Sequence, residues 1–428
     1  MPDTLGDWLV HLEALHPKGV AGIELGLERV AQVSRALAQR RSFPLITVAG
    51  TNGKGSTSAM LASILGCAGY RVGLYTSPHL LDYNERVRIA GQSVDSMALC
   101  RSFARVEEAR GGTALTYFEF GTLAAWECFA AAAVDVAILE VGLGGRLDAV
   151  NIYDSDCAVV TGIDIDHTEY LGSTREAIGF EKAGIFRGGK PAVCADPDPP
   201  HSLVEHALAI GADLRLIGRD FGYQRQDGQW QYWAKEGEQI RRRSALAHPA
   251  LRGAMQLQNA SAALAVLGML RELLPVAMQD IRRGLLEVQL PGRFQVIPGR
   301  PLVILDVAHN PQAARVLSDN LASQLGDGAY HPRSWAVFGM LRDKDVAAVI
   351  DALAGRVTHW LPCSLSGSRA AHADELARLL ASRGIAVPRL FSSPLEAFRH
   401  AQENAGDDDR IVVFGSFQTV ADVLRELA

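Results

Sequence analysis

A glycine-rich segment carrying one lysine and two hydroxyl side chains is the stretch best suited to bind phosphate. In Gly50-Thr-Asn-Gly-Lys-Gly-Ser-Thr57 the glycines let the backbone approach phosphate oxygens, and Lys54 can reach the terminal phosphates. Ser56 or Thr57 can offer a hydroxyl to Mg²⁺. The segment therefore predicts a nucleoside triphosphate site. A turn that only joins a strand to a helix would not need lysine and serine between its glycines.

The segment departs from the usual P-loop motif at two positions. Val48 stands where the first glycine of that motif would be, and Gly55 separates Lys54 from Ser56. A generic P-loop nucleoside triphosphatase is therefore not the expected class.

Two apolar runs, each with the pattern of a buried strand, end near polar side chains that can bind a metal. Arg71–His79 contains Ser77, and Val134–Asp148 contains Glu140 followed by three glycines. A carboxylate that ends a hydrophobic strand is costly unless it is paired or bound to a metal. Beside a phosphate loop, Mg²⁺ is the expected partner of Glu140. Ser77 considered alone is more simply explained as a turn or a cap.

A further apolar run, Cys157–His167, closes on Asp164, Asp166 and His167. A lone histidine usually has a structural role. Because ligands bind at the carboxyl ends of parallel strands, three such strand ends in one half of the chain indicate a shared metal site.

The elements that position these residues follow from hydrophobic periodicity. Leu45 begins a buried strand that leads into the phosphate loop, and Ser58–Gly69 has helical spacing. Further helices are predicted at 3–16, at 94–110, 118–133, 174–186 and from 255 onward, and the segment from Ile23 begins as a turn and continues as a helix to about residue 41. Residues 191–250 alternate short strands with turns.

A Pro- and Gly-containing stretch at 290–295 separates a second region of strand–helix alternation. The predicted fold is α/β, with an N-terminal P-loop-type parallel-sheet ATPase domain at 1–292, a linker at 293–300 and a smaller C-terminal Rossmann-like α/β domain at 301–428. Its strands are expected at 301–311, 334–339, 357–361, 386–391 and 410–415.

Composition narrows the class of protein. The 428 residues are 48% hydrophobic and 21% charged, and the formal net charge is −6, so nucleic acid is an unexpected partner. The six cysteines show no metal-binding or C-x-x-C spacing, which favours a reducing compartment. No signal peptide pattern or membrane-length apolar run is present. We expect a cytoplasmic monomer with no membrane partner.

Several phrases of the sequence resemble the ATP-dependent Mur ligase superfamily. The phosphate loop ending Lys54-Gly-Ser56 is most similar to the folylpolyglutamate synthase branch. Two further motifs of the family are matched in the expected order, by Thr76-Ser-Pro-His-Leu80 and by the stretch Asp306–Pro311. Only about 45 residues precede the phosphate loop, too few for the nucleotide-sugar-binding domain that Mur ligases carry. The chain thus resembles the dihydrofolate synthase/folylpolyglutamate synthase family, and Leu115-Thr-Tyr-Phe-Glu119 resembles its bifunctional bacterial form.

The resemblance implies a reaction. ATP would phosphorylate a carboxylate of the substrate, and L-glutamate would attack the acyl phosphate to leave an amide, ADP and phosphate. The implied substrates are dihydropteroate, tetrahydrofolates and L-glutamate, with ATP and two Mg²⁺ ions as cofactors. Two alternatives remain open: a nucleotide-dependent switch that hydrolyses ATP without ligating, and a Mur-type ligase of cell-wall precursors.

The resemblance also implies site residues in distant segments. The expected contacts of ATP are Asn52, Gly53, Lys54, Gly55, Ser56, Asn259, Arg293, Asp306 and His309. The expected Mg²⁺ ligands are Ser56, Ser77, Glu140, His167 and Lys182, the last as a carbamylated lysine. Of these residues, Lys54, Glu140, His167 and Lys182 are expected to be catalytic.

The aromatic segment at 115–120 would by itself be interpreted as core. The resemblance makes it part of a pterin site, because a flat ring needs an aromatic face and a polar edge partner. The implied contacts of dihydropteroate are Glu24, Leu25, Gly26, Thr116, Tyr117, Phe118, Glu119, Leu147, Asp148 and Ala149. Candidates for the glutamate pocket are Ser364, Ser366, Ser416 and His372.

Overall fold

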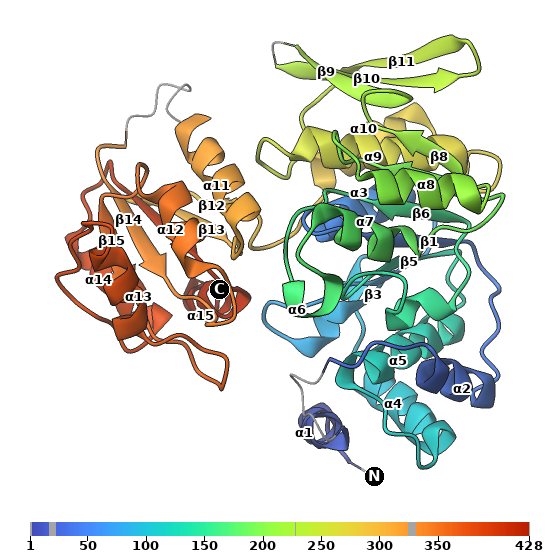
Figure 1. Cartoon of the computed structure of the whole chain (residues 1–428), viewed down its shortest axis with the longest axis horizontal. Coiled ribbons are helices and arrows are strands. Elements are labelled where there is room, and N and C mark those ends of the chain that lie inside the picture. Colours follow the sequence, from blue (N-terminus) through green and yellow to red (C-terminus); the bar gives the residue numbers. More distant parts are fainter. Residues whose placement is uncertain (1, 17–22, 227, 324–330, 428) are drawn as a thin grey trace. The chain divides into compact units, whose positions relative to one another are not determined.

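The computed structural model describes residues 2–16, 23–226, 228–323 and 331–427, which divide into two compact units (Figure 1). Unit 1 comprises Met1–Ala250 and Leu257–Val288, and unit 2 comprises Leu251–Gln256 and Gln289–Ala428. The short segment Leu251–Gln256 belongs to unit 2 because, for example, the Ala254 amide donates to Asn320 Oδ1 at 2.8 Å. Sequence patterns did not indicate this excursion of the chain.

An eight-stranded sheet with the order β4-β3-β2-β5-β1-β6-β7-β8 forms the centre of unit 1. Strands β1, β2, β5, β6, β7 and β8 pair in parallel, whereas β3 and β4 are antiparallel additions at one edge. Central β1 is buried along its whole length, as expected for a parallel strand covered on both faces. The strands are β1 Leu45–Ala49, β2 Val72–Tyr75, β3 Val87–Ile89, β4 Gln92–Ser93, β5 Val136–Glu140, β6 Cys157–Val160, β7 Pro191–Cys194 and β8 Asp213–Leu216.

Helices cover both faces of this sheet (Figure 1). On one face, apolar side chains of α4, α5, α7 and α8 share a core with Leu45, Leu139 and Val160. Helix α3 packs on β1, β2 and β5 and against α10. The helices are α1 Leu5–Leu15, α2 Glu28–Ala36, α3 Lys54–Cys67, α4 Ser96–Arg110, α5 Tyr117–Ala131, α6 Thr168–Leu171, α7 Arg175–Ala183, α8 His201–Ala209, α9 Gln256–Met269 and α10 Met278–Glu287.

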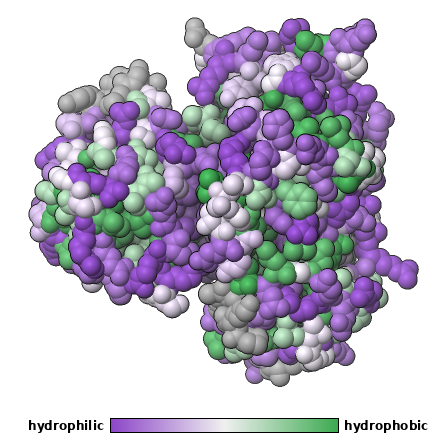
Figure 2. Space-filling view, viewed as in Figure 1, coloured by the Kyte–Doolittle hydropathy of each residue, from purple (hydrophilic) through white to green (hydrophobic). Residues whose placement is uncertain are grey.

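Most of these helices lie within a few residues of their predicted ranges. The helix expected to continue to about residue 41 ends at Ala36. The region 191–250 contains α8, which was not predicted. The same region ends in a three-stranded antiparallel sheet of β9 Phe221–Gln226, β10 Gln229–Glu236 and β11 Gln239–Leu246. Figure 2 shows the surface of this small sheet as mainly hydrophilic, in keeping with the exposed residues of β11.

Unit 2 is a smaller α/β domain with the strand order β12-β13-β16-β14-β15. Strands β13 to β16 are parallel, as predicted, and Ile304, Phe338 and Val412 pack in its core. Its elements are β12 Gln295–Ile297, β13 Leu302–Asp306, α11 Pro311–Ser323, β14 Ser334–Phe338, α12 Val346–Leu353, β15 His359–Pro362, α13 Ala373–Ala381, α14 Pro394–Asn404, β16 Arg410–Phe414 and α15 Phe417–Leu427.

Two predictions for this unit were wrong. The stretch 386–391 is not a strand, and only Phe391 forms an isolated bridge, with Cys363. Pro388 lacks the amide that a ladder needs. The expected linker 293–300 contains β12, which pairs antiparallel with β13. The linker segment is therefore part of the sheet.

Within the described residues, no helix is long and apolar enough to span a membrane.

Candidate active site

The phosphate loop lies between the end of β1 and the start of α3. Gly53 has φ = 91° and is the N-cap of α3, so the amides of the first helical turn are directed at the loop. Lys54 opens the helix, and its Nζ donates to Gly50 O at 2.8 Å and to Thr51 O at 3.1 Å. The predicted residues Asn52 to Ser56 therefore lie in a turn at a helix N-terminus, where backbone amides are available to an anion.

The loop is fastened to the segment that follows β6. The Thr51 amide donates to Gly162 O at 2.7 Å, and the Thr161 hydroxyl donates to Asn52 O at 2.7 Å. The Thr51 hydroxyl also bonds the backbone of Asp164 at 3.0 Å. The roles of Thr51 and Thr161 could not be predicted from sequence, because no local pattern distinguishes a threonine that braces a neighbouring segment.

Asn259, a predicted nucleotide contact, lies beside the loop. A Cβ added to Gly53 would lie 2.6 Å from Asn259 Oδ1, so the amide side chain occupies the space that glycine leaves open. Asn259 is buried on α9, whose neighbouring residue Gln258 donates to Ala195 O at 2.6 Å. The helix thus holds the asparagine against the phosphate loop.

Sheet topology brings the predicted metal ligands to one edge. Glu140 is the last residue of β5 and pairs in register with Val48 of β1, directly before the phosphate loop. Ser77 lies two residues beyond β2, the other neighbour of β5. The run predicted as a strand to His167 ends as a strand at Val160, so His167 lies seven residues beyond β6, the other neighbour of β1. Its backbone is left-handed (φ = 51°) as the N-cap of α6. Four adjacent strands therefore deliver these residues and the loop to the same edge.

Lys182 on α7 is 3% exposed. Burial lowers the pKa of its amine to about 7, and the nearby charge of Lys54 lowers it further, while Asp166 and Asp148 oppose the change. Close packing of α7 on the glycine-rich loop after β5 accounts for the burial, since the Arg146 amide donates to Glu181 O at 2.7 Å. A neutral lysine amine is the form that can react to give a carbamate.

The donor types at this edge suit Mg²⁺ bound to phosphate. No group of three or more His, Cys, Asp or Glu residues in the described ranges is arranged to hold a metal by itself. Mg²⁺ does not require one, because it usually takes one or two carboxylates together with phosphate oxygens and water. Glu140, at 4% exposure, is a buried carboxylate next to the phosphate loop, which fits that pattern.

The three segments predicted to hold dihydropteroate are brought together. The Gly26 amide donates to Leu147 O at 3.3 Å, which joins 24–26 to 147–149. Phe118 packs on the loop after β5, since a Cβ added to Gly142 would lie 2.7 Å from its ring. Phe118 and Tyr117 are only partly buried, so their rings can provide an aromatic face.

Asp148 is buried, and its carboxylate accepts from the amides of Leu143 at 2.8 Å and Val150 at 3.1 Å. Burial raises its pKa to about 7, and those amides together with Lys54 oppose the rise. Asp148 therefore titrates near neutral pH beside the phosphate loop.

Glu119 was predicted to be a polar partner for the edge of the pterin ring, but its carboxylate is already bound by other groups of the protein. Its side chain accepts from the Thr116 amide at 2.7 Å, which completes a capping box at the start of α5. It also forms an ion pair with Arg29 at 3.0 Å. Both of its oxygens are thus engaged within the protein.

Unit 2 brings together its own predicted nucleotide contacts. Asp306 accepts from the amides of Phe294 at 2.9 Å and Ala308 at 2.8 Å, and burial raises its pKa while Arg293 opposes the rise. Arg293 lies over the ring of Phe417 at 5.1 Å, and the His309 ring is 6.1 Å from the same ring. These residues form one cluster at the end of β13.

All four glutamate-pocket candidates take part in local hydrogen bonds. The Ser416 hydroxyl bonds that of Thr419 at 2.7 Å, and Ser364 Oγ accepts from the Ala373 amide at 3.0 Å.

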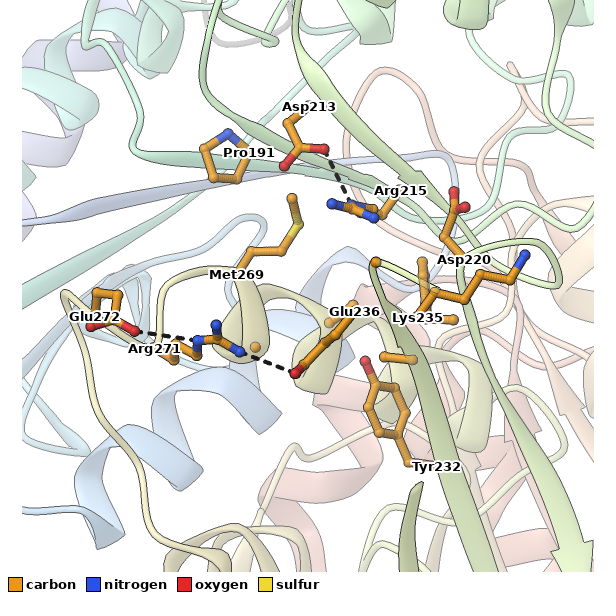
Figure 3. A pocket seen from close by; sticks show the side chains of 15 residues that line it. Pro191, Asp213, Arg215, Asp220, Tyr232, Lys235, Glu236, Met269, Arg271 and Glu272 are labelled. Carbon is orange, nitrogen blue, oxygen red and sulfur yellow. Dashed lines mark hydrogen bonds and ion pairs between the residues drawn. The ribbon is translucent and has the colours of Figure 1, made fainter. Parts of the chain in front are cut away.

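A separate cavity of about 440 Å³ lies in unit 1 between β8, β10 and the end of α9 (Figure 3). Among its charged side chains, Arg271 contacts Glu236 at 3.1 Å and Arg215 contacts Asp213 at 3.2 Å. None of the predicted site residues lines it.

Comparison with known families agrees with this geometry. The model of the Mur ligase middle domain matches residues 48–267, and that of the Mur ligase glutamate ligase domain matches residues 292–417. A phosphate loop on a parallel sheet, followed by such a second domain, defines the class as an ATP-dependent ligase of the Mur type.

Relatives and solved structures specify the branch. Dihydrofolate synthase/folylpolyglutamate synthase of Escherichia coli strain K12 is 45% identical over 98% of this chain and 94% of its own length. The E. coli FolC structure in complex with DHPP and ADP superposes with a TM-score of 0.92 at 43% identity, covering 100% of this chain and 99% of its own. The chain belongs to the dihydrofolate synthase/folylpolyglutamate synthase family.

A further structure, of a bifunctional folylpolyglutamate synthase/dihydrofolate synthase with Mn, AMPPNP and L-glutamate bound, has a TM-score of 0.90 at 47% identity, covering 99% of this chain and 98% of its own. Its ligands correspond in kind to the nucleotide, divalent metal and amino acid predicted here.

Proposed function

We propose that unit 1 activates the carboxylate of dihydropteroate, and of tetrahydrofolates, with ATP, and that L-glutamate then forms an amide with the activated group. The observation that carries this proposal is the convergence of β2, β5, β1 and β6, whose adjacent ends present Ser77, Glu140, the phosphate loop and His167. Donors of these types would stabilise the charge that develops as the phosphoryl group is transferred.

The phosphate loop would bind the triphosphate through the amides at the start of α3 and through Lys54. Bound Mg²⁺ would neutralise charge on the phosphate oxygens. Ser56, Ser77, Glu140 and His167 would hold the metal ions, and Lys182 would join them once carbamylated. Asn259 would line the nucleotide side of the loop. In unit 2, Arg293, Asp306 and His309 would contribute further nucleotide contacts.

The substrate carboxylate is a poor acyl donor until the γ-phosphoryl group has been transferred to it. Its oxygen attacks the γ-phosphorus, the bond to the β-phosphate oxygen breaks, and ADP leaves. The uncharged amine of glutamate next attacks the acyl carbon, loses a proton, and phosphate departs to leave the amide. Positioning and electrostatics supply the rate, because no side chain has to form a covalent intermediate.

The pterin ring would lie against the segments 24–26, 116–119 and 147–149. Tyr117 and Phe118 would supply the aromatic surface, and Asp148 a buried acceptor or donor whose state depends on pH.

An ADP-release assay tests this function, with dihydropteroate, tetrahydrofolate and glutamate each omitted in turn. The expected result is ADP release only when an acceptor and glutamate are both present. ADP release that is the same with and without dihydropteroate and tetrahydrofolate would instead favour a nucleotide-dependent switch. Release stimulated by a nucleotide-sugar peptide would favour a cell-wall ligase.

We also propose that the enzyme works as a cytoplasmic monomer without nucleic acid or membrane partners. All six cysteines are free, as expected in a reducing compartment. A dimer in light-scattering measurements at assay concentration would contradict the monomer.

A further inference from the structure

Arg29 stands at an unusual position for a cation. It lies in the first turn of α2, where the positive end of the helix dipole disfavours a basic side chain. The guanidinium is compensated by two carboxylates from different segments. Its Nη2 lies 3.0 Å from Glu119 Oε1, and its Nη1 pairs with Glu24. Nη2 also donates to the backbone oxygen of Glu24 at 3.0 Å.

The Glu119 end of this bridge is buried. Glu119 is 3% exposed, and the same carboxylate accepts from the Thr116 amide. A buried carboxylate deprived of its cation is strongly destabilised. Arg29 therefore helps to keep the capping box formed, and with it the first turn of α5 that carries Tyr117 and Phe118.

The Glu24 end fixes a segment without regular secondary structure. Residues 23–26 form no helix or strand, so their conformation depends on side-chain and loop contacts. Arg29 donates hydrogen bonds to both the side chain and the backbone oxygen of Glu24. The Gly26 amide donates to Leu147 O at 3.3 Å. One guanidinium thus links two of the three pterin-binding segments, and the Gly26 amide links the third.

We propose that Arg29 is a positioning residue for the pterin-bearing substrate, which it serves by holding the segment 24–26 against the start of α5. The proposal rests on the proposed function, because that function makes these segments the pterin site. Arg29 itself needs no contact with the ring. The phosphate loop is braced independently through Thr51 and Thr161, so nucleotide binding should not depend on Arg29.

Steady-state kinetics of Arg29→Gln test the proposal, with Arg105→Gln as the matched control. Arg105 also pairs with a buried glutamate of α5, since its Nη1 lies 2.8 Å from Glu127 Oε2. Both variants remove an arginine from a buried carboxylate on the same helix, but only Arg29 reaches the segment 24–26. We expect Arg29→Gln to raise KM for dihydropteroate about tenfold, with KM for ATP within about twofold of wild type. Arg105→Gln should leave both values unchanged.

Arg29→Lys keeps the charge but cannot hold two carboxylates with a planar fork, so an intermediate KM is expected. A thermal melt shows whether each variant is folded. If Arg29→Gln folds poorly, the KM of Arg29→Lys still tests the proposal. An unchanged KM for dihydropteroate in the folded Arg29 variants would overturn the inference about Arg29 but leave the proposed function standing. An equal rise in KM for ATP would have the same consequence. A wild-type enzyme inactive on dihydropteroate would instead overturn the proposed function.

Discussion

The hydroxyl of Thr161 donates a hydrogen bond of 2.7 Å to the backbone oxygen of Asn52. The segment after β6 therefore holds the phosphate loop in the conformation that presents its amides. The bond is partly buried, and its donor lies 109 residues away along the chain. Strand adjacency, rather than any local pattern, makes it possible.

Thr161→Val should weaken both the loop and the fold. Losing the bond leaves Asn52 O without this donor, so we expect a loss of about 1 kcal/mol in unfolding free energy and a roughly fivefold higher KM for ATP. Urea denaturation and kinetics measure the two effects. The control is Thr47→Val in β1, because Thr47 Oγ1 is buried and makes no hydrogen bond among the described residues. If both variants behave alike, the bond has no special role.

Lys54→Ala and Glu140→Ala should each abolish ligation while the protein stays folded. Each would remove a charge that we propose stabilises phosphoryl transfer, and the expected fall in kcat is at least about 10²-fold. ADP release measures activity, and a melting curve within a few degrees of wild type verifies folding. Full activity in either purified variant would contradict the proposed role of the residue replaced.

Asp148 should make stability depend on pH. Its folded pKa of about 7 lies above the ordinary value of 3.8, so between these values the folded protein binds a proton that the unfolded chain releases. This proton stabilises the folded protein fully below about pH 4, and the stabilisation is lost as pH rises through about 7. The free energy of unfolding should fall by at most roughly 4 kcal/mol over this range. Asp148→Asn should remove this slope in denaturation series from about pH 5 to 8. An equal slope in both proteins would refute the assignment.

Lys182 should carry a carbamate. Because its pKa is about 7, the neutral amine predominates above that pH, whereas an ordinary lysine would remain charged. Protein equilibrated with ¹³C-bicarbonate should show a carbamate carbon resonance that strengthens as pH rises through 7. The signal should be absent from Lys182→Arg, whose guanidinium stays charged. A persistent signal in that variant would place the carbamate on another residue.

Gly284→Ala should destabilise unit 1 through the contact of α10 with α3. A Cβ at Gly284 would lie 2.5 Å from the Cα of Ile64, so the helices would have to separate, at a cost of about 1–3 kcal/mol. Gly268→Ala on α9 is the control, since its Cβ would meet no atom within 4 Å and alanine favours a helix. Chemical denaturation of both variants measures the difference. Equal stability would show that α3 and α10 can move apart freely.

Local patterns predicted many of the elements because each depends on short-range sequence. The apolar run at Leu45 and the glycines around Lys54 define β1 and the phosphate loop. The predicted strand at 386–391 was wrong, because an apolar run without hydrogen-bonded neighbours in a sheet does not form a strand.

Taken alone, the sequence determined the residue types of the site and the order of the strands that carry them, since glycine, lysine and carboxylate chemistry belongs to the residues themselves. Only the tertiary structure decided which strand ends are neighbours, that Thr161 braces the loop and that Arg29 joins Glu24 to Glu119. Such contacts link residues far apart in the chain, and burial in the folded protein shifts the pKa values of Lys182 and Asp148. Neither adjacency nor burial is a property of a short stretch of sequence.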